Sequence, residues 1–428
     1  MKATLLYIYA LLAALTLGAC SDNYLDTESN DAEKRLILSK TSYIAMAVNG
    51  LSKMMSTQYL SSQGMNGEGA ILTLYGNYHG NDFQKCDLTG WVQMTNLDFV
   101  ENSTSIYDYY PWYYYYKILG NANAIINNVD AATGPDNEKR FLKAQALTFR
   151  AYCFFRLSQV YSKRWSDSNN GASRGVVLRL DESTGDMAVS TLAETYARIY
   201  QDLDDALALY AESKLNRDED ENYAVNADVA HAIYARAALT REDWAVAASH
   251  AASARANYTL MNNAQYVNGG FNAPNKEWIW SVYSNAQETL YFYQFFANQG
   301  SNSNAALARN YPCAISKELY DSIPTTDVRR AMFLNPDTMT FNTSSGLAGK
   351  WMTAYAKRAY KKKLYSTSRI YAYMQFKMQA VSNPGVGEIP LFRAAEMYLT
   401  EAEANCHLGK DAEAQALLVA LNKTSERD

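Results

Sequence analysis

The most constraining feature of this chain is a helical spacing of mostly apolar residues that recurs in separate blocks. In each block the residues are three or four positions apart, which places them on one face of a helix. The four clearest blocks are Trp112, Tyr116, Leu119, Asn123 and Ile126; Leu147, Ala151, Phe154, Ser158 and Tyr161; Leu192, Tyr196, Ile199, Leu203, Ala206 and Tyr210; and Phe392, Ala395, Leu399, Ala402 and Cys406. This spacing predicts a mainly α-helical fold.

Two segments have the pattern of two helices joined by a short turn. One runs from Asn226 to Arg255 and the other from Phe392 to Asn422. Alanines at facing positions let such helices approach closely, and each unit of ~34 residues buries its apolar face only against its neighbours. The pattern resembles degenerate tetratricopeptide repeats. The alternative is an irregular helical bundle with alanine-rich cores.

Two regions lack a helical period. Residues 61–104 are rich in Gly, Asn and Tyr, and residues 261–390 carry most of the turn sequences, apart from a short strand predicted at Glu277–Val282. Long loops within a compact domain usually serve function, and loops held by a rigid scaffold are a common binding architecture. We therefore expect a scaffold of helix–turn–helix repeats, a loop-rich aromatic half that faces a ligand, and a few short strands.

The amino-terminal residues have the composition of an export signal. Lys2 is followed by an apolar run over residues 5–17, which is shorter than the ~20 residues that span a bilayer. The run ends in Leu17-Gly18-Ala19-Cys20, which resembles a bacterial lipoprotein signal cleaved before Cys20. Cys20 would then carry acyl chains that hold the protein at a membrane surface. The alternative is an ordinary signal peptide with a chance cysteine.

These patterns divide the chain into five parts. We predict a signal peptide at 1–19, a tether at 20–39, a helical-repeat region at 40–260 with an inserted loop at 61–104, a loop-rich ligand-facing region at 261–390, and a carboxy-terminal helical hairpin at 391–428.

Composition excludes several classes of protein. The 428 residues are 48% apolar and 19% charged, which is typical of a globular chain, and the formal charge of −5 favours no nucleic-acid partner. Tyrosines number 34 against 14 phenylalanines. This excess indicates surfaces that are apolar on one side and in contact with water on the other. Besides Cys20, the cysteines form no CxxC pair, and those within helical patterns are expected to be buried packing residues. They are Cys86, Cys153, Cys313 and Cys406, and the helical ones are Cys153 and Cys406.

Catalytic and metal-binding motifs are lacking in the sequence. It contains no Gly-x-Ser-x-Gly, His-Glu-x-x-His or Gly-x-x-x-x-Gly-Lys motif. Asp218–Asn222 matches the start of a calcium loop, but Tyr223 and Val229 stand where the loop needs Gly and Glu. The histidines have no ligand spacing, and the last three lie in predicted helices: His79, His231, His250 and His407. We therefore expect neither an enzyme nor a cofactor or metal.

Four motifs, in order, resemble the SusD/RagB family of Bacteroidetes outer-membrane lipoproteins. They are Cys20-Ser-Asp-Asn-Tyr-Leu-Asp; the Arg-Ala-x-x-x-Phe-x-Leu helix within Phe141–Leu157; the helix Thr191–Leu209 with its Asp202-Leu203 pair; and Arg-x-x-Glu-x-Tyr-Leu-x-x-Ala-Glu-Ala, which begins at Arg393. Family members usually continue beyond the last helix with a Glu-Leu…Glu-Gly-x-Arg segment. Because this chain ends at Asp428, the resemblance predicts a truncated or shortened member.

The resemblance implies a non-enzymatic nutrient receptor, anchored in the outer membrane through Cys20 and facing the cell exterior. Such proteins lie over a TonB-dependent transporter of the SusC type, and most of them bind oligosaccharides. Their helical repeats face the transporter and their loop-rich half meets the ligand. Two alternatives stay open: a peptide-binding member of the same family, and a helical-repeat scaffold for envelope assembly with no small ligand.

A sugar site needs exposed aromatic rings flanked by polar groups that pair with hydroxyls. The first candidate cluster follows Leu74, although its tyrosines could equally cover the scaffold. The second and third clusters are more compatible with structural roles. The candidates are Tyr75, Asn77, Tyr78, Asn81, Asp82 and Trp91; then Tyr283 and Tyr291; then Trp351 and Tyr355.

Overall fold

The computed structural model describes residues 36–57, 65–76, 84–86, 102–284, 294–335, 341–342, 344–383 and 385–425. Its helices are α3 (Thr41–Met54), α4 (Gly67–Leu74), α6 (Ile106–Asn128), α7 (Asp136–Tyr161), α8 (Leu192–Ser213), α9 (Ala227–Thr240), α10 (Trp244–Arg255), α11 (Asn263–Val267), α12 (Phe295–Gln299), α13 (Ala306–Asn310), α14 (Lys317–Ser322), α15 (Lys350–Ala359), α16 (Ala394–His407) and α17 (Asp411–Ser425). Its strands are β1 (Gln84–Lys85), β2 (Trp278–Val282), β3 (Cys313–Ala314) and β4 (Ile389–Arg393). Within the described residues, none of the helices is both long and apolar enough to cross a membrane.

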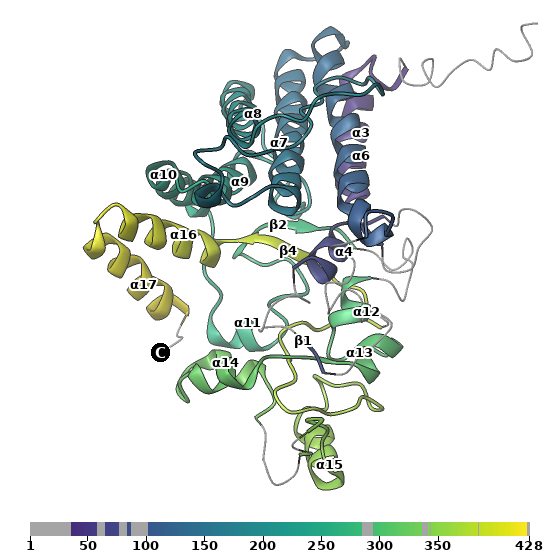
Figure 1. The fold of residues 1–428 in the computed structure, drawn as a ribbon, viewed down its shortest axis with the longest axis vertical. Coiled ribbons are helices and arrows are strands. Elements are labelled where there is room, and N and C mark those ends of the chain that lie inside the picture. The colour runs from purple at the N-terminus through teal and green to yellow at the C-terminus, as the bar shows by residue number, and fades with distance from the viewer. Residues whose placement is uncertain are drawn as a thin grey trace, which may run out of the picture.

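Long helices form one end of the molecule. Figure 1 shows α3, α6, α7 and α8 at that end, with α9, α10 and α16 continuing the helical region to one side. Helices adjacent in sequence pack pairwise: α6 on α7, α7 on α8, α9 on α10, and α16 on α17. Helix α16 also packs on α10, which joins the α16–α17 hairpin to the α9–α10 hairpin. The predicted mainly α-helical fold of helix–turn–helix units is confirmed.

The start of α8 illustrates how local sequence sets a helix boundary. The Thr191 hydroxyl accepts a hydrogen bond from the Glu194 backbone N–H, and the Glu194 carboxylate accepts one from the Thr191 N–H. This capping box satisfies two backbone donors that the first helical turn leaves without partners. The periodic residues from Leu192 to Tyr210 then face the core, as the spacing predicts.

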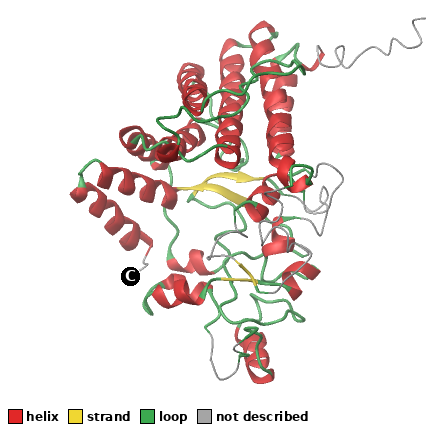
Figure 2. Cartoon of the chain, in the orientation of Figure 1, coloured by secondary structure: helices red, strands yellow, loops and turns green. Residues whose placement is uncertain are grey.

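The other end of the molecule consists of short helices and irregular segments (Figure 2). Between the two ends lies a sheet in which β2 pairs antiparallel with β4, with Trp278 opposite Arg393 and Val282 opposite Ile389. The structure confirms the predicted strand, and every residue of β2 is buried, Ser281 included, which explains why it lacks polar–apolar alternation. A second pair, β1 with β3, lies among the short helices.

The structure differs from the predicted elements at two places. The last periodic block begins in a strand, because Phe392 belongs to β4 and helix α16 begins only at Ala394. The region 61–104, which has no apparent helical period, contains the helix α4. Its glycines at 67 and 69 argue against a helix locally, but nearly all of its residues are buried, so packing overrides that preference.

The cysteine prediction holds for one helix and fails for the other. Cys153 is fully buried in α7, whereas Cys406 is exposed on α16. Helix α7 is covered by α3, α6 and α8, while α16 packs mainly against α10 and α17, so more of its surface stays open. The four described cysteines are free thiols.

Buried and partly buried ion pairs join separate elements of the scaffold. The Arg150 guanidinium of α7 donates two hydrogen bonds to the Asp202 carboxylate of α8, at 2.8 and 2.6 Å. Arg236 of α9 makes a similar two-pronged contact with Glu396 of α16, at 2.7 Å for each bond. Arg393 pairs with Glu277 at 2.6 Å across the β2–β4 sheet. Arg150, Asp202, Arg393 and Glu396 all belong to the motifs that carry the family resemblance, so these motif residues hold the scaffold together.

Two histidines also join α9 to α10. The Nδ1 atoms of His231 and His250 are 2.8 Å apart, and the Tyr234 ring stacks on His250 with ring centroids 3.9 Å apart. Burial, and secondarily His231, lowers the pKa of His250 from 6.5 to about 4. Burial also lowers the pKa of His231, against the attraction of Asp228. The pair is therefore neutral at pH 7, with one ring donating a hydrogen bond to the other.

We expect acid to weaken this helix pair. Because the pKa of His250 is lower in the folded chain than in the unfolded one, the unfolded state binds more protons between pH 6.5 and 4. Stability is thus lost as the pH falls through that range, by roughly 1–2 kcal/mol once partial exposure is allowed for. Thermal unfolding of the His250→Gln variant should depend less on pH than that of the parent between pH 7 and 4.5. The same pH dependence for the variant and the parent would contradict the prediction.

Candidate functional site

A pair of exposed aromatic rings lies on α15, at the end of the molecule opposite the long helices (Figure 1). Trp351 is 60% exposed and Tyr355 is 41% exposed. Their ring centroids are 5.6 Å apart and their planes differ by only 5°. A spacing of four residues places both on the same face of the helix. Together they present two parallel apolar rings to solvent.

The inner face of α15 holds this pair in place. Met352 and Ala356 are buried, and Ala356 belongs to a small apolar core. The other buried members of that core are Leu334, Leu364, Ile370, Met374 and Phe376. Tyr360, directly after the helix, stacks on Phe376 with ring centroids 4.6 Å apart. Because one face of α15 is packed, its other face is kept toward solvent.

Two exposed cationic side chains lie on the same helix as the two rings. They are Lys350 and Arg358, and Arg358 lies three positions after Tyr355. Both side chains are hydrogen-bond donors without acceptor atoms. Lys361 and Lys362, just beyond the helix, are exposed, whereas Lys363 is half-buried with Nζ 5.8 Å from the Phe376 ring centroid. Burial lowers the pKa of Lys363.

The sequence favours a structural role for Trp351 and Tyr355, but the structure leaves both rings exposed. The reason is that α15 was not predicted. Two pairs with a spacing of four, Trp351 with Tyr355 and Met352 with Ala356, could have indicated a short helix with an exposed and a buried face. The neighbouring Lys350 and Arg358 were missed for the same reason.

Tyr75 lies directly after α4 and is engaged by the scaffold. Its hydroxyl donates a hydrogen bond of 2.6 Å to the backbone oxygen of Tyr107 in α6. Burial raises the pKa of Tyr75. The half-buried Tyr75 therefore makes a structural contact that ties the end of α4 to α6.

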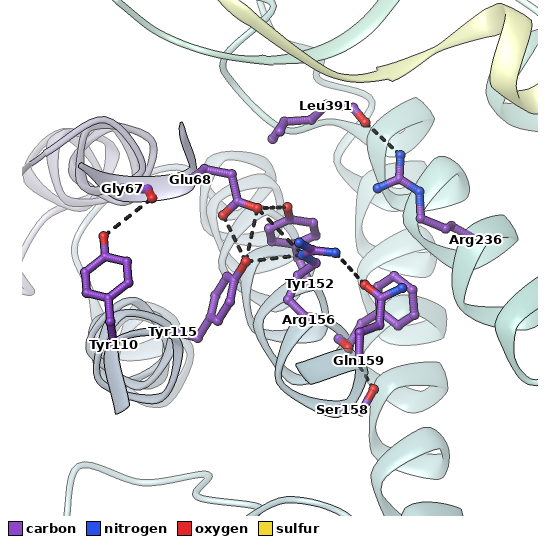
Figure 3. A network of polar contacts seen from close by, with 11 residues as sticks. Gly67, Glu68, Tyr110, Tyr115, Tyr152, Arg156, Ser158, Gln159, Arg236 and Leu391 are labelled. Carbon is purple, nitrogen blue, oxygen red and sulfur yellow. Dashed lines mark hydrogen bonds and ion pairs between the residues drawn. The ribbon is translucent and has the colours of Figure 1, made fainter. Parts of the chain in front are cut away.

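A buried carboxylate fixes α4 against α6 and α7 (Figure 3). The Tyr115 hydroxyl lies 3.0 and 3.1 Å from the two Glu68 oxygens, and the Tyr152 hydroxyl donates to one of them at 2.7 Å. The Arg156 guanidinium lies 3.6 Å from the carboxylate. Burial, reinforced by the Glu68 charge, raises the pKa of both tyrosines. Glu68 thereby carries three interactions between α4 and the long helices.

Tyr283 lies after β2 and is half-buried. Its ring meets Tyr223 edge-on, with centroids 5.2 Å apart. Beside it is a cavity of about 40 Å³ lined in part by Val282, Ser284 and Phe295. That volume suits one or a few waters and is too small for a sugar ring.

The remaining predicted site residues lie outside the described residues: Asn77, Tyr78, Asn81, Asp82, Trp91, Tyr291 and the lipidation residue Cys20. Of the described candidates, the structure brings Trp351 and Tyr355 together on α15. Tyr75 and Tyr283 follow α4 and β2, toward the middle of the molecule, and so lie apart from that pair (Figure 1).

No metal site is found among the described residues, where no group of three or more His, Cys, Asp or Glu side chains converges. In the acidic segment, Glu221 accepts a hydrogen bond from the Tyr223 hydroxyl at 2.7 Å. The neighbouring Arg217 donates to backbone oxygens of Ala224 and Ile279. These contacts with the rest of the chain hold the acidic segment and its neighbour Arg217 against the scaffold.

Two family models match the sequence. The model described as starch-binding, associating with the outer membrane, matches residues 23–239, and the model of the SusD family matches residues 243–424. No curated protein matches significantly.

Solved structures share the fold. A SusD-like carbohydrate binding protein from Bacteroides vulgatus is 22% identical, with 91% of this chain and 76% of that chain covered and a TM-score of 0.74. A SusD superfamily protein from Bacteroides thetaiotaomicron is 19% identical, with 90% and 80% covered and a TM-score of 0.67. Surface glycan-binding protein A from Bacteroides thetaiotaomicron, solved in complex with laminarihexaose, is 15% identical, with 90% and 82% covered and a TM-score of 0.64.

The two family models lie end to end along the chain, and its fold matches that of solved members. The resemblance inferred from the four motifs is confirmed: this chain belongs to the SusD family.

Proposed function

We propose that the protein is a non-catalytic surface lipoprotein that binds oligosaccharides or polysaccharides and passes them to a TonB-dependent transporter of the SusC type. The observation that carries this proposal is the exposed, parallel pair Trp351 and Tyr355 on a chain of the SusD family. The laminarihexaose bound to one solved structure of the same fold supports a glycan as the ligand.

The chemistry of the pair suits a sugar. A pyranose ring has an apolar face of C–H groups, which can stack on an aromatic ring, and a rim of hydroxyls, which need hydrogen-bond partners. Trp351 and Tyr355 supply the rings, and the exposed Lys350 and Arg358 of the same helix supply hydrogen-bond donors. Since Ala356 and Met352 hold the helix, little conformational freedom is lost when a ligand docks.

Removal of the larger ring should weaken binding strongly. We expect Trp351→Ala to lower the affinity for the bound glycan about 5- to 30-fold, since loss of a stacked aromatic contact costs about 1–2 kcal/mol. Isothermal titration calorimetry with laminarin and soluble starch, followed by a wider glycan panel, measures the change. Because Trp351 is exposed, the variant should unfold at the parent's temperature.

The control is Tyr109→Ala, which removes an exposed tyrosine from α6, a helix that lies apart from α15 (Figure 1), and should leave affinity unchanged. Equal affinity for the parent and Trp351→Ala would refute the site. Binding of peptides alone would replace the glycan by a peptide ligand, and binding of neither would favour an assembly scaffold. Release of shorter sugars from a labelled polysaccharide would contradict the non-catalytic proposal.

The transporter partner can be tested separately. Acylated protein carrying an affinity tag should co-purify with a TonB-dependent transporter from detergent-solubilised outer membranes. The Cys20→Ala chain should appear in the soluble fraction of the same cells. Recovery of that variant with the membranes, without any transporter, would contradict both the anchor and the partner.

A further inference from the structure

The segment that contains α15 carries a local excess of positive charge. Residues 338–387 include eight lysines and arginines and no aspartate or glutamate, although the formal charge of the whole chain is −5. The eight cations are Lys350, Lys357, Arg358, Lys361, Lys362, Lys363, Arg369 and Lys377. Like charges gathered in one segment repel each other, so their presence here is not explained by the stability of the fold.

Most of these cations are exposed to solvent. Two that are not, Lys363 and Lys377, lie over the rings of Phe376 and Phe271, at 5.8 and 4.7 Å from the ring centroids. The exposed ones are Lys350, Arg358, Lys361, Lys362 and Arg369. Within the described residues, no carboxylate forms an ion pair with the four of these that lie on α15 or directly after it. Their charges are therefore open to a ligand.

The position of Lys350 is not explained by the helix that it begins. The amino-terminal end of a helix carries partial positive charge, so acidic residues stabilise it and basic residues do not. The first turn of α15 contains no acidic residue, and the N-cap Gly349 has no side chain that could accept a hydrogen bond from the backbone. This end of α15 therefore combines backbone donors with a cation and lacks an anionic partner of its own.

The fold brings a second segment to the same end of α15. An antiparallel bridge joins Leu347, just before the helix, to Tyr371. Continued toward the helix, this register places the backbone of Arg369 opposite the N-cap of α15. The Arg369 backbone N–H donates a hydrogen bond of 2.9 Å to the backbone oxygen of Arg309 in α13. Cationic residues from separate segments therefore meet where α15 begins.

The chemistry of these side chains distinguishes a charged sugar from a neutral one. A sugar hydroxyl both donates and accepts hydrogen bonds, whereas lysine and arginine side chains only donate. Carboxylate and sulfate groups only accept, and their hydrogen bonds to cationic donors are shorter and stronger than those between neutral groups. A surface whose charged groups are all donors thus matches an anionic ligand better than a neutral one.

We propose that the α15 site binds anionic glycans, whose sugars carry carboxylate or sulfate groups. The inference rests on the proposed function, because it names the class of ligand for the same site. Trp351 and Tyr355 stack on the sugar rings, and the exposed cations of the segment pair with the anionic groups. Nucleic acid also combines stackable rings with negative charge, but the formal charge of −5 and membership of the SusD family favour a glycan.

The test compares polygalacturonic acid and chondroitin sulfate with neutral laminarin, by calorimetry at low and high salt. We expect at least one of the anionic glycans to bind more tightly than laminarin, and salt to weaken that binding because it screens exposed charges. The triple variant Lys350→Gln, Arg358→Gln, Lys361→Gln should lower the affinity for the anionic glycan about ten-fold, since each exposed charge pair contributes roughly two- to five-fold. Glutamine keeps a hydrogen-bond donor, so any affinity for laminarin should change less than about two-fold.

The matched control replaces three exposed lysines of the helical scaffold by glutamine, and so removes the same charge elsewhere: Lys163, Lys214 and Lys410. This variant should bind like the parent, and both triple variants should unfold at the parent's temperature because all six positions are exposed.

An equal loss of affinity in the two triple variants would overturn the proposal. So would binding of a single-stranded oligonucleotide as tight as that of the anionic glycans. Laminarin binding that depends on Trp351, without any preference for anionic glycans, would overturn this proposal and leave the proposed function intact. Binding of no glycan would overturn both.

Discussion

Replacement of Asp202 by alanine should lower the free energy of unfolding by about 3–5 kcal/mol. Asp202 is fully buried and holds two guanidinium groups: Arg150 through two hydrogen bonds, and Arg198 at 2.6 Å. Without the carboxylate, the buried Arg150 keeps, among the described residues, the Asn123 side-chain oxygen as its acceptor, at 3.1 Å. Removing one partner of such a pair leaves an uncompensated charge in the interior. Urea unfolding followed by circular dichroism measures the change.

Asp205 provides the matched control. It lies on the same helix, is exposed, and accepts a hydrogen bond from the Gln201 amide at 2.8 Å. Asp205→Ala should alter stability by no more than about 0.5 kcal/mol. The double variant Arg150→Met, Asp202→Leu should recover part of the loss, because it removes both charges. A similar small effect for Asp202→Ala and Asp205→Ala would show that the pair does not stabilise the packing of α7 on α8.

Glu68→Ala should destabilise the chain by about 3 kcal/mol. The carboxylate accepts hydrogen bonds from Tyr115 and Tyr152 and faces Arg156, and it is fully buried (Figure 3). Its removal leaves two buried hydroxyls and a guanidinium without this acceptor. Glu68→Gln keeps the volume but loses the charge, so we expect an intermediate loss of about 1–2 kcal/mol. Hydrogen exchange should accelerate first in α4.

The comparison for this prediction is Glu212→Ala, which breaks an exposed ion pair with Arg140. Such surface pairs contribute about 0–1 kcal/mol. If Glu68→Ala were no more destabilising than Glu212→Ala, or if exchange in α4 were unchanged, the carboxylate would not be what holds α4 to the long helices.

The long helices could be predicted because their periodicity is local. In α8, the capping residues Thr191 and Glu194 and the repeating apolar face lie within one continuous segment, so boundary and burial follow from the same twenty or so residues. Helices α4 and α15 could not be predicted in this way. In α4, glycines disfavour a helix that burial then imposes, and α15 has only ten residues, so its helical spacing does not repeat over several turns.

The motif residues are a different case. The sequence showed Arg150, Asp202, Arg393 and Glu396 as parts of family motifs, without their partners. Glu277, the partner of Arg393, directly precedes β2, and Arg236, the partner of Glu396, lies in α9. Each partner is more than one hundred residues away from the motif residue that it contacts. Only the packed chain shows that these charges join helices and strands.

By itself, the sequence determined the helical scaffold, the strand at β2, the family and the type of ligand to consider, because each depends on residues that are neighbours along the chain. The tertiary structure decided which aromatic rings face solvent: Trp351 and Tyr355 do, and Tyr75 is engaged by α6. It also placed Arg369 opposite the start of α15. The exposure of a side chain depends on what segments remote in sequence place over it, and composition and spacing carry no record of that.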